Sequence, residues 1–146
     1  MTNMLIKKIN EEAVTPTRGS KYAAGYDLYA CINEKVEILP GETKLIGTGI
    51  AIQLPECTFG AIFARSGLAV KKGLRPANCV GVIDEDYRGE VMIALHNDST
   101  YTHIIEPKER IAQLIVMPYM SVNCYLVSEL NETERNDGGF GSTGSK

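Results

Sequence analysis

Three short segments combine glycine with small hydroxyl or charged residues in a pattern that suits phosphate. They are ARSGLA at 64–69, RIAQL at 110–114 and RNDGGFGSTG at 135–144. Glycines let backbone N–H groups approach an anion, and Arg, Ser and Thr donate further hydrogen bonds to its oxygens. Each segment alone is a weak signal, because a Gly- and Ser-rich C-terminus is usually a tail or a linker. The embedded Phe140 argues against a plain linker.

A fourth segment, NCVGVIDEDYRGEV at 78–91, has three consecutive carboxylates between two apolar runs. The simple interpretation is a strand, an acidic turn and a second strand, in which alternation directs Asp84 and Asp86 to one side and Glu85 to the other. A polar hairpin turn is the commoner fate of such a string. The presence of three candidate anion-binding segments in the same chain favours a chemical role for this acidic segment.

The elements that hold these segments are predicted to be strands. Leu39–Gly41 and Leu54–Glu56 form turns between apolar runs, so we expect consecutive strands to return on each other. The best helical candidate is Ser66–Lys72, which Gly67 and Gly73 limit to a turn or two. An all-β barrel or sandwich is expected. The runs rich in β-branched and apolar residues that predict its strands are KVEIL, TKLIGTGIAIQL, FGAIFA, EVMIAL, HIIEP and RIAQLIVMPY.

Length and charge limit the class of protein. The 146 residues fit one domain, because a domain of about this size buries roughly 68 to 70% of its unfolded surface. The net charge of −3 gives no basic stripe, so we expect neither a nucleic acid nor a membrane as partner. The N-terminus has no apolar signal region, and no apolar run approaches roughly 18 residues. We therefore expect a cytoplasmic or otherwise intracellular protein without a secretion signal.

The cysteines and histidines are not in metal-ligand spacing. The cysteines lack paired CxxC spacing, and we expect four buried, reduced thiols. His96 and His103 lie seven residues apart without a neighbouring Cys or carboxylate cluster, so we interpret them as surface or strand residues. The four cysteines are Cys31, Cys57, Cys79 and Cys124.

The composition changes at about Ser128, where SELNETERND carries many charges and few large apolar groups. Beyond it, GGFGSTGSK has too little apolar area to order itself. We therefore predict a β-barrel domain over residues 1–127. Residues 128–146 are predicted to form a flexible C-terminal arm unless a ligand binds it.

In chain order, five segments resemble the five motifs of the trimeric deoxyuridine triphosphatase (dUTPase) family. The resemblance covers the chain nearly end to end, and the third and fifth motifs are long and specific. It implies a jelly-roll-like β-barrel, the dUTPase fold, assembled as a homotrimer with shared active sites. It also implies a dUTP diphosphatase that converts dUTP to dUMP and pyrophosphate, limiting uracil in DNA and supplying dUMP for dTTP synthesis. The segments are AAGYDLYA at 23–30, ARSGLA at 64–69, NCVGVIDEDYRGEV at 78–91, ERIAQL at 109–114 and RNDGGFGSTG at 135–144.

The resemblance implies that Asp84 is the general base, whose carboxylate holds the water that attacks the α-phosphorus. By similarity, Arg65 orients Asp84 or phosphate oxygens, and Gln113 donates its amide to an α- or β-phosphate oxygen. Ser66 and Gly67 match the phosphate-binding turn. The predicted catalytic residues are Asp84, Arg65 and Gln113. All three are also predicted to bind the substrate, together with Ser66 and Gly67.

The base and sugar contacts are implied in the same way. Asn78 and the backbone of Val82 and Ile83 are expected to read uracil by hydrogen bonds that cytosine cannot match. Met92 is expected to line this pocket, although core filling is nearly as common for a lone methionine. The ring of Tyr87 is expected to pack on the deoxyribose and exclude a 2′-hydroxyl.

The resemblance also implies that the arm is a lid that closes over an active site. The resemblance implies that Arg135 reaches the γ-phosphate, that Phe140 stacks on uracil, and that Gly141, Ser142 and Thr143 surround the triphosphate. Closure excludes water and strengthens electrostatic stabilisation of the leaving pyrophosphate. Mg²⁺ is expected to bind mainly through the substrate phosphates and water, with no protein metal ligand.

The chain departs from the family pattern at a few positions. Ala64 replaces a common Pro, Glu109 a common Asp, and Asn136 and Asp137 small residues. The charge of Asp137 is expected to weaken arm binding to a triphosphate. Asp27 has two open interpretations, as a ligand of magnesium-bound waters or as a subunit contact.

Two other functions compete with this interpretation. A sister enzyme of similar fold deaminates dCTP, and some members perform both steps, but the intact GGFGSTG segment favours phosphohydrolysis. A non-catalytic nucleotide sensor or protein-binding module would usually lose the base or the arm, whereas both are present.

Overall fold

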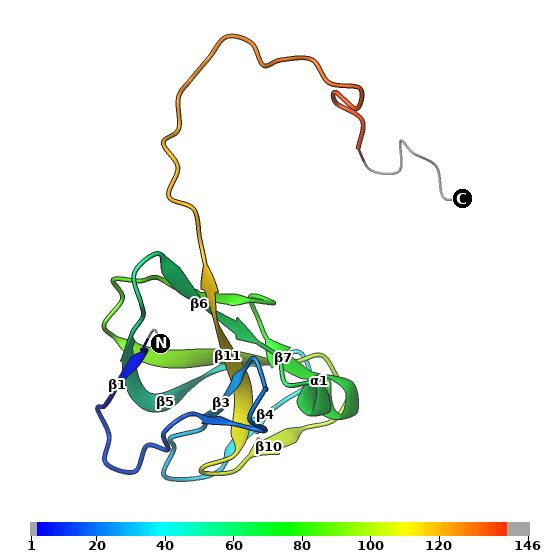
Figure 1. Cartoon of the computed structure of the whole chain (residues 1–146). Helices are drawn as coiled ribbons and strands as arrows, with labels where there is room; N and C mark the ends of the chain where they lie inside the picture. Colours follow the sequence, from blue (N-terminus) through cyan, green and yellow to red (C-terminus); the bar gives the residue numbers. More distant parts are fainter. Residues whose placement is uncertain (1–2, 140–146) are drawn as a thin grey trace.

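The computed structural model describes residues 3–139, which fold into a β-barrel-like sandwich with an extended C-terminal segment (Figure 1). The elements are β1 (Leu5–Lys8), β2 (Thr17–Arg18), β3 (Tyr26–Tyr29), β4 (Val36–Ile38), β5 (Thr43–Gln53), β6 (Thr58–Phe63), α1 (Ser66–Lys72), β7 (Leu74–Pro76), β8 (Gly81–Ile83), β9 (Glu90–Asn97), β10 (His103–Ile105) and β11 (Arg110–Pro118). One sheet has the order β1-β5-β9-β7, a second has the order β2-β3-β11-β6-β8, and β10 pairs with β4.

The core lies between the two large sheets. In β9 the side chains of Val91, Ile93 and Leu95 are buried, and alternate positions between them are more exposed. The long strands β5 and β11 each pair with two neighbours, so they lie inside their sheets. Alternating burial is what two facing sheets require. The apolar runs expected to be strands are confirmed as strands, and so is the all-β class.

The expectation that consecutive strands return on each other was wrong at both turns. The turn at residues 39–41 joins β4, which pairs with β10, to β5, which pairs with β1 and β9. The turn at residues 54–56 joins β5 to β6, which lies in the other sheet. Turn residues reverse the chain, but they do not decide which sheet the next strand joins. That choice depends on burying the apolar faces of both sheets against one core.

Helix α1 forms over the residues expected, Ser66–Lys72. It ends because Gly73 adopts the left-handed conformation, with φ of 64°, and its N–H donates to the carbonyl oxygens of Ala69 and Leu68. Leu68 is buried and anchors the helix against the barrel. Among residues 3–139, no helix has the length and apolar content needed to span a membrane.

The expectation of four buried thiols was wrong. Cys31 is partly buried, and the other three cysteines are exposed. Cys57 and Cys79 lie in connections between strands, with φ of 56° and 60°, so their side chains project from turns rather than into the core. His96 and His103 lie in strands β9 and β10, as expected.

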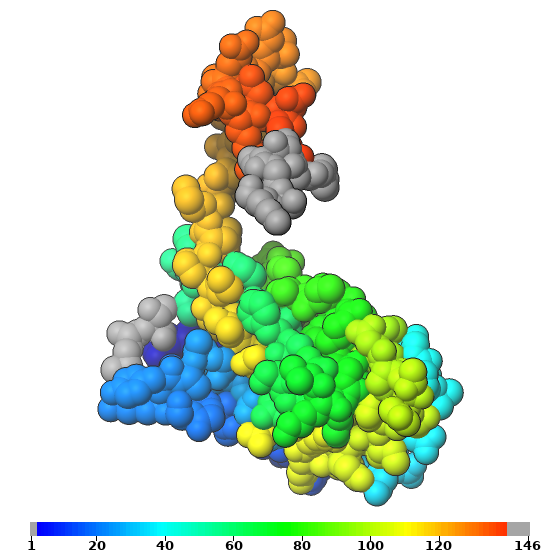
Figure 2. Space-filling view, turned by 90° about the vertical axis from the view of Figure 1, so that its right-hand side faces the viewer, coloured from blue at the N-terminus to red at the C-terminus, as the bar shows by residue number. Residues whose placement is uncertain are grey.

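The last strand ends at Pro118, before the composition change at Ser128. Residues 119–139 form neither strand nor helix and extend away from the barrel (Figures 1 and 2). Apolar side chains of this segment, including Tyr125 and Leu126, are exposed because nothing in the described chain packs against them. The extended segment therefore begins nine residues before the composition change at Ser128.

Candidate active site

Two pockets contain most of the residues singled out from the sequence. The first, called the α1 pocket, has a volume of about 350 Å³ and lies at the start of α1. The second, called the β8–β9 pocket, is of similar volume, about 350 Å³, and lies between β8 and β9. The α1 pocket is lined by Gly19, Ala23, Ala24, Gly25, Asp27, Arg65, Ser66, Gly67, Arg110, Gln113 and Ile115. The β8–β9 pocket is lined by Leu45, Val82, Ile83, Asp84, Tyr87, Glu90 and Met92.

The start of α1 offers backbone donors to the α1 pocket. The first N–H groups of a helix have no intrahelical partner, and the N-cap residue Arg65 makes no side-chain cap. Ser66 and Gly67 are exposed, and a Cβ added to Gly67 would meet open space. This combination of a hydroxyl, free N–H groups and room for a ligand suits an anion.

Asp27 holds two arginines at the wall of the α1 pocket. Arg65 donates from Nε to Asp27 Oδ1 over 2.8 Å, and Arg110 donates from Nη1 to Asp27 Oδ2 over 3.2 Å. The Asp27 side chain is only 13% exposed, so both ion pairs are partly shielded from water. With two guanidinium groups and one carboxylate, this cluster is net positive.

These contacts add to what was expected of the three residues. Within the described part of the chain, Arg65 donates to Asp27 and to the carbonyl oxygen of Arg110, and it forms no hydrogen bond or ion pair with Asp84. Asp27 therefore anchors two arginines of its own chain, a role that neither earlier interpretation included. Arg110 was not among the expected site residues. Its position depends on an irregularity in the pairing of β11 with β3, which sequence pattern does not reveal.

Gln113 is fixed between the ends of two strands. Its Nε2 donates to the carbonyl oxygen of Ala64 over 2.9 Å. On its other side, a Cβ added to Gly25 would lie 2.7 Å from Gln113 Oε1, so only glycine leaves the amide in place. A primary amide has two N–H donors, and one therefore remains for a ligand. Because Ala64 contributes a backbone oxygen, the absence of a proline there does not alter this contact.

The β8–β9 pocket has exposed apolar walls beside a carboxylate. Val82, Tyr87 and Met92 are all exposed large apolar residues, so Met92 lines this pocket rather than filling the core. The Tyr87 hydroxyl donates to the carbonyl oxygen of Glu90 over 3.0 Å, which fixes the direction of the ring. Asp84 is exposed at the end of β8. A flat ring bound against these walls would lie close to that carboxylate.

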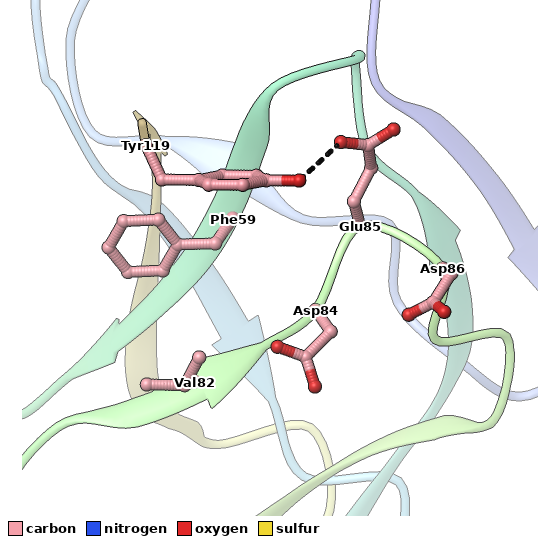
Figure 3. Close-up of a pocket in the computed structure, with 6 residues that line it drawn as sticks. All are labelled: Phe59, Val82, Asp84, Glu85, Asp86 and Tyr119. Atoms are coloured by element: carbon pink, nitrogen blue, oxygen red, sulfur yellow. Dashed lines mark hydrogen bonds between the residues drawn. The ribbon is translucent and has the colours of Figure 1, made fainter. Parts of the chain in front are cut away.

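The acidic segment was expected to be a hairpin turn, and this expectation was wrong. Strand β8 pairs with β6, whereas β9 pairs with β5 and β7, so the segment crosses between sheets. The Tyr87 N–H donates to the carbonyl oxygen of Asp84 over 3.1 Å and closes a turn. Asp84, Glu85 and Asp86 all line one hollow of about 590 Å³. Glu85 points toward Tyr119, and the Asp84 and Asp86 carboxylates point to the other side, as expected (Figure 3).

Within this hollow Glu85 is engaged in structural contacts. Its Oε2 accepts hydrogen bonds from the Cys57 N–H over 2.8 Å and from the Tyr119 hydroxyl over 3.1 Å (Figure 3). The hydrogen bond to the Glu85 carboxylate raises the pKa of Tyr119. Glu85 thus ties the Asp84 turn to the start of the C-terminal segment. The neighbouring Asp84 carboxylate points away from this contact.

Two other expected site residues, Asn78 and Arg135, are not among the residues that line the two pockets. Asn78 is exposed in the turn between β7 and β8, near Gly81. Arg135 donates from Nε to the carbonyl oxygen of Gly138 over 2.8 Å, in a local turn of the extended segment. The two pockets have no lining residue in common. Ile83, next to Asp84, pairs with Gly60 of β6, whereas Gln113 pairs with Phe63, so Asp84 and Gln113 lie at different positions along that strand. Four further expected residues lie outside the described part of the chain, namely Phe140, Gly141, Ser142 and Thr143.

Comparison with known proteins gives one consistent family. The dUTPase family model matches residues 11–144. A deoxyuridine 5'-triphosphate nucleotidohydrolase of Hydrogenobaculum sp. (strain Y04AAS1) is 48% identical over 143 residues, which cover 98% of this chain and 99% of the relative. A protein of the same name from Clostridioides difficile is 47% identical over 144 residues, covering 99% of each chain.

Solved structures agree with the sequence relatives. A mutant dUTPase of Staphylococcus bacteriophage 80alpha, solved with dUpNHpp, has a TM-score of 0.85 at 28% identity and covers 99% of both chains. A mutant dUTPase from phage phi11 of S. aureus has a TM-score of 0.80 at 25% identity, covering 89% of this chain and 99% of that chain. The expected jelly-roll-like dUTPase fold is therefore confirmed, and the chain belongs to the dUTPase family.

Proposed function

We propose that the protein hydrolyses dUTP to dUMP and pyrophosphate, as a dUTP diphosphatase that limits uracil in DNA and supplies dUMP for dTTP synthesis. The observation that carries this proposal is an exposed carboxylate, Asp84, at the rim of a pocket with apolar walls. The solved 80alpha relative contains dUpNHpp, and the curated relatives are named for this reaction. The apolar walls of this pocket suit a flat base and a sugar, and Asp84 beside them supports hydrolysis of the attached triphosphate.

We propose that the reaction proceeds by in-line attack of water on the α-phosphorus. Asp84 holds this water and takes one of its protons as the new O–P bond forms. The bond from the α-phosphorus to the oxygen bridging to the β-phosphorus breaks, and pyrophosphate leaves with that oxygen and the bonding electrons. Water supplies the oxygen that dUMP gains, so no further reactant is needed.

The phosphate chain is proposed to bind the α1 pocket. Ser66 and Gly67 would donate to the β-phosphate, while Arg65 and the free N–H of Gln113 donate to neighbouring oxygens. The net positive cluster of Arg65, Asp27 and Arg110 supports this assignment, because it is already aligned before a ligand arrives. Such preorganised donors stabilise charge that develops on the leaving pyrophosphate.

The base and sugar are proposed to bind the β8–β9 pocket. Asn78 and the backbone of Val82 and Ile83 would pair with the uracil edge, and a cytosine would leave these groups mismatched. Tyr87 would pack on the deoxyribose, and its hydroxyl contact with a backbone oxygen supports a fixed ring position. Met92 would close the far wall of the pocket.

Magnesium is proposed to bind through the substrate phosphates and water. Among residues 3–139, no group of three or more His, Cys, Asp or Glu side chains could hold a metal ion. Oxygen ligands from phosphates and water suit this hard cation. When bound, Mg²⁺ spreads the negative charge of the leaving pyrophosphate. The solved phi11 structure is described as revealing the coordination of a structural Mg(II) ion in that protein.

The arm is proposed to close over the occupied site. Arg135 would reach the γ-phosphate and Phe140 would stack on uracil, with Gly141, Ser142 and Thr143 around the triphosphate. The full triphosphate provides contacts that offset the entropy of ordering these residues. The turn at Arg135 supports the proposal, because Arg135 is exposed and its side-chain hydrogen bond is to the nearby carbonyl oxygen of Gly138.

We propose a homotrimer in which each site combines residues of more than one chain. The separation of Asp84 from the α1 pocket supports this arrangement. Mixing two inactive variants tests it. If Asp84→Asn and Arg65→Met chains are co-refolded in equal amounts, about a quarter of the sites regain an intact Asp84 and an intact Arg65, with proportional recovery of dUTP turnover.

The control for this experiment mixes the two variants after separate folding, without subunit exchange. Sedimentation equilibrium reports whether the assembly has three chains. Recovery of activity only in the co-refolded sample supports shared sites. Co-refolded mixtures that sediment as trimers but stay inactive would show that each site belongs to one chain.

Product analysis tests the reaction itself. Purified protein with Mg²⁺ is offered dUTP, UTP, dCTP and dTTP separately, and nucleotides and pyrophosphate are resolved by ion-exchange chromatography. We expect conversion of dUTP alone to dUMP plus pyrophosphate. Formation of dUTP from dCTP would establish a deaminase, and no turnover of any nucleotide would establish a binding module.

Gly25→Ala is expected to lower kcat/KM for dUTP by about 10²-fold, the scale of a misplacement of about 1 Å at a reacting centre. The new methyl group would meet Gln113 Oε1 and push the amide from its contact with the Ala64 carbonyl oxygen. Steady-state kinetics measure the change. Gly19→Ala is the matched control, because Gly19 lines the same pocket but its Cβ would meet nothing within 4 Å. Equal kinetics for the two variants would contradict the assigned role of Gln113.

A further inference from the structure

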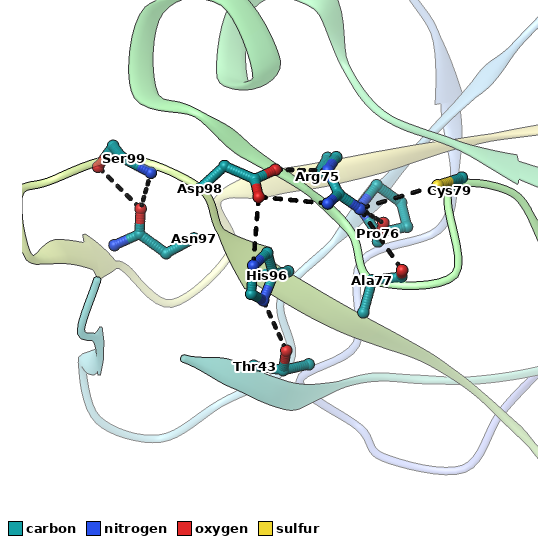
Figure 4. Close-up of polar contacts among 9 residues, drawn as sticks. All are labelled: Thr43, Arg75, Pro76, Ala77, Cys79, His96, Asn97, Asp98 and Ser99. Carbon is teal, nitrogen blue, oxygen red and sulfur yellow. Dashed lines mark hydrogen bonds and ion pairs between the residues drawn. The ribbon is translucent and has the colours of Figure 1, made fainter. Parts of the chain in front are cut away.

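The turn that carries Asn78 is held by one arginine. This turn, residues 76–80, runs from the last residue of β7 to the start of β8 and is called the Asn78 turn. Arg75 Nη1 donates to the carbonyl oxygens of Pro76 over 3.1 Å and Ala77 over 3.4 Å, and to Cys79 Sγ over 3.8 Å (Figure 4). A single guanidinium nitrogen therefore contacts three successive parts of the turn.

The conformation of the Asn78 turn needs such support. Cys79 adopts a φ of 60°, in the left-handed region that a side chain with a Cβ rarely adopts. Backbone hydrogen bonds hold the two flanks, since Ala77 N–H donates to Ala94 O over 2.7 Å and Cys79 N–H donates to Pro76 O over 3.1 Å. Asn78 is exposed between these flanks, so its position depends on the contacts on either side.

Arg75 is itself fixed by Asp98. Its Nε and Nη2 donate to the two carboxylate oxygens of Asp98, the second over 3.2 Å, in a two-point contact (Figure 4). The Asp98 N–H donates to Gly73 O over 2.9 Å, and His96 Nε2 lies 3.2 Å from Asp98 Oδ1. The hydrogen bond to Asp98 raises the pKa of Arg75. Because Nε and Nη2 contact Asp98, Nη1 remains to donate to the Asn78 turn.

We propose that Arg75, oriented by Asp98, is a positioning residue that sets selectivity for uracil over cytosine by fixing the Asn78 turn. The inference rests on the proposed function, in which Asn78 helps to read the base. Uracil and cytosine differ in the donors and acceptors on one edge, so rejection of cytosine requires a reading group that does not move. A loosened turn would let the Asn78 amide adapt to either base.

The test compares kcat/KM for dUTP and dCTP in Arg75→Met, which keeps an unbranched side chain but removes every donor. We expect the dUTP preference to fall by about 10-fold or more, the scale of one hydrogen-bond mismatch. KM for dUTP should carry most of the change, and kcat should stay within about threefold of wild type, because Arg75 does not line either pocket. A loss confined to kcat, with selectivity intact, would overturn the proposal.

Asp98→Asn keeps Arg75 but weakens its two-point contact with residue 98, and should also reduce the preference for dUTP over dCTP. Combining it with Arg75→Met should add little to the loss from Arg75→Met alone, because the two residues act through one contact. If the losses of selectivity in the two single variants add in full in the double variant, the two residues do not act through one contact and the proposal is overturned. Arg75→Lys and Asp98→Asn carry the test if Arg75→Met does not fold. Lys35→Met is the matched control, since it removes an exposed ion pair with Glu106 elsewhere on the barrel.

The failure of this inference can be told apart from failure of the proposed function. If the wild-type protein does not hydrolyse dUTP, or uses dCTP equally well, the proposed function is wrong. If wild type is selective and Asn78→Ala reduces selectivity, but the Arg75 and Asp98 variants stay selective, only the positioning role is wrong. Loss of selectivity in all three variants, at an unchanged midpoint of thermal unfolding, supports both.

Discussion

Replacing Asp84 with Asn is expected to lower kcat for dUTP hydrolysis by about 10²- to 10⁴-fold, the usual scale for a general base. The amide has nearly the shape of the carboxylate, but it cannot accept a proton from water. Asp84 is exposed in a turn that is closed by a hydrogen bond from the Tyr87 N–H to the Asp84 carbonyl oxygen. The substitution leaves this backbone hydrogen bond intact. Steady-state and single-turnover kinetics measure the loss, which should fall on the chemical step rather than on KM.

Glu56→Gln is the control for Asp84→Asn, because Glu56 is an exposed carboxylate in the turn before β6. It should keep wild-type turnover. Both variants should unfold at the wild-type midpoint, since neither side chain is part of the core. Turnover by Asp84→Asn within a few-fold of wild type would remove Asp84 from the role of general base.

Deleting residues 135–146 is expected to lower kcat/KM for dUTP by about 10²-fold or more, the scale reported for losing one charge-stabilising donor. The deletion removes the proposed γ-phosphate contact of Arg135 and the proposed stacking of Phe140. The thermal unfolding midpoint should not change. The hydrogen bonds that the structure shows for residues 133–138 are local, and none of them reaches the barrel. Kinetics and calorimetry on the same preparation test both statements.

Phe140→Ala separates stacking from phosphate binding in the arm. It should raise KM for dUTP, whereas Arg135→Met should lower kcat/KM for dUTP more than for a diphosphate analogue. Removal of Ser145 and Lys146 alone is the control, because no role is proposed for them. A full deletion with wild-type kinetics would show that the arm does not act as a lid.

Much of the fold follows from local sequence. The alternation Val91, Ile93, Leu95 predicts β9, and the glycines at 67 and 73 predict the short length of α1, because burial and backbone conformation are local properties. The pairing of strands is not local. The segment after Ile83 leads to a different sheet, and no residue type in DEDYRG distinguishes that crossing from a hairpin.

The candidate site divides in the same way. Asp84 and Tyr87 can be identified from the sequence, because their motif is long. The structure then places both beside one pocket. Arg110 and Glu90 were missed. Arg110 reaches Asp27 only through the register of β11 on β3, and Glu90 lines the β8–β9 pocket while its carboxylate accepts the Gly49 N–H over 2.7 Å. Such roles arise from pairing between strands that are far apart in sequence.

The anchoring of Tyr119 by Glu85 sets the reach of the C-terminal segment. From this fixed point to Arg135 there are sixteen residues, which span up to roughly 50 Å when extended. That span exceeds the diameter of a domain of this size, which is roughly 40 Å. In the proposed homotrimer, a tether of such length would reach sites on neighbouring subunits, and its effective concentration at each site would fall slowly with added residues. Insertions between Tyr119 and Arg135 should therefore weaken arm action gradually, whereas deletions that leave the tether shorter than the span should abolish it abruptly.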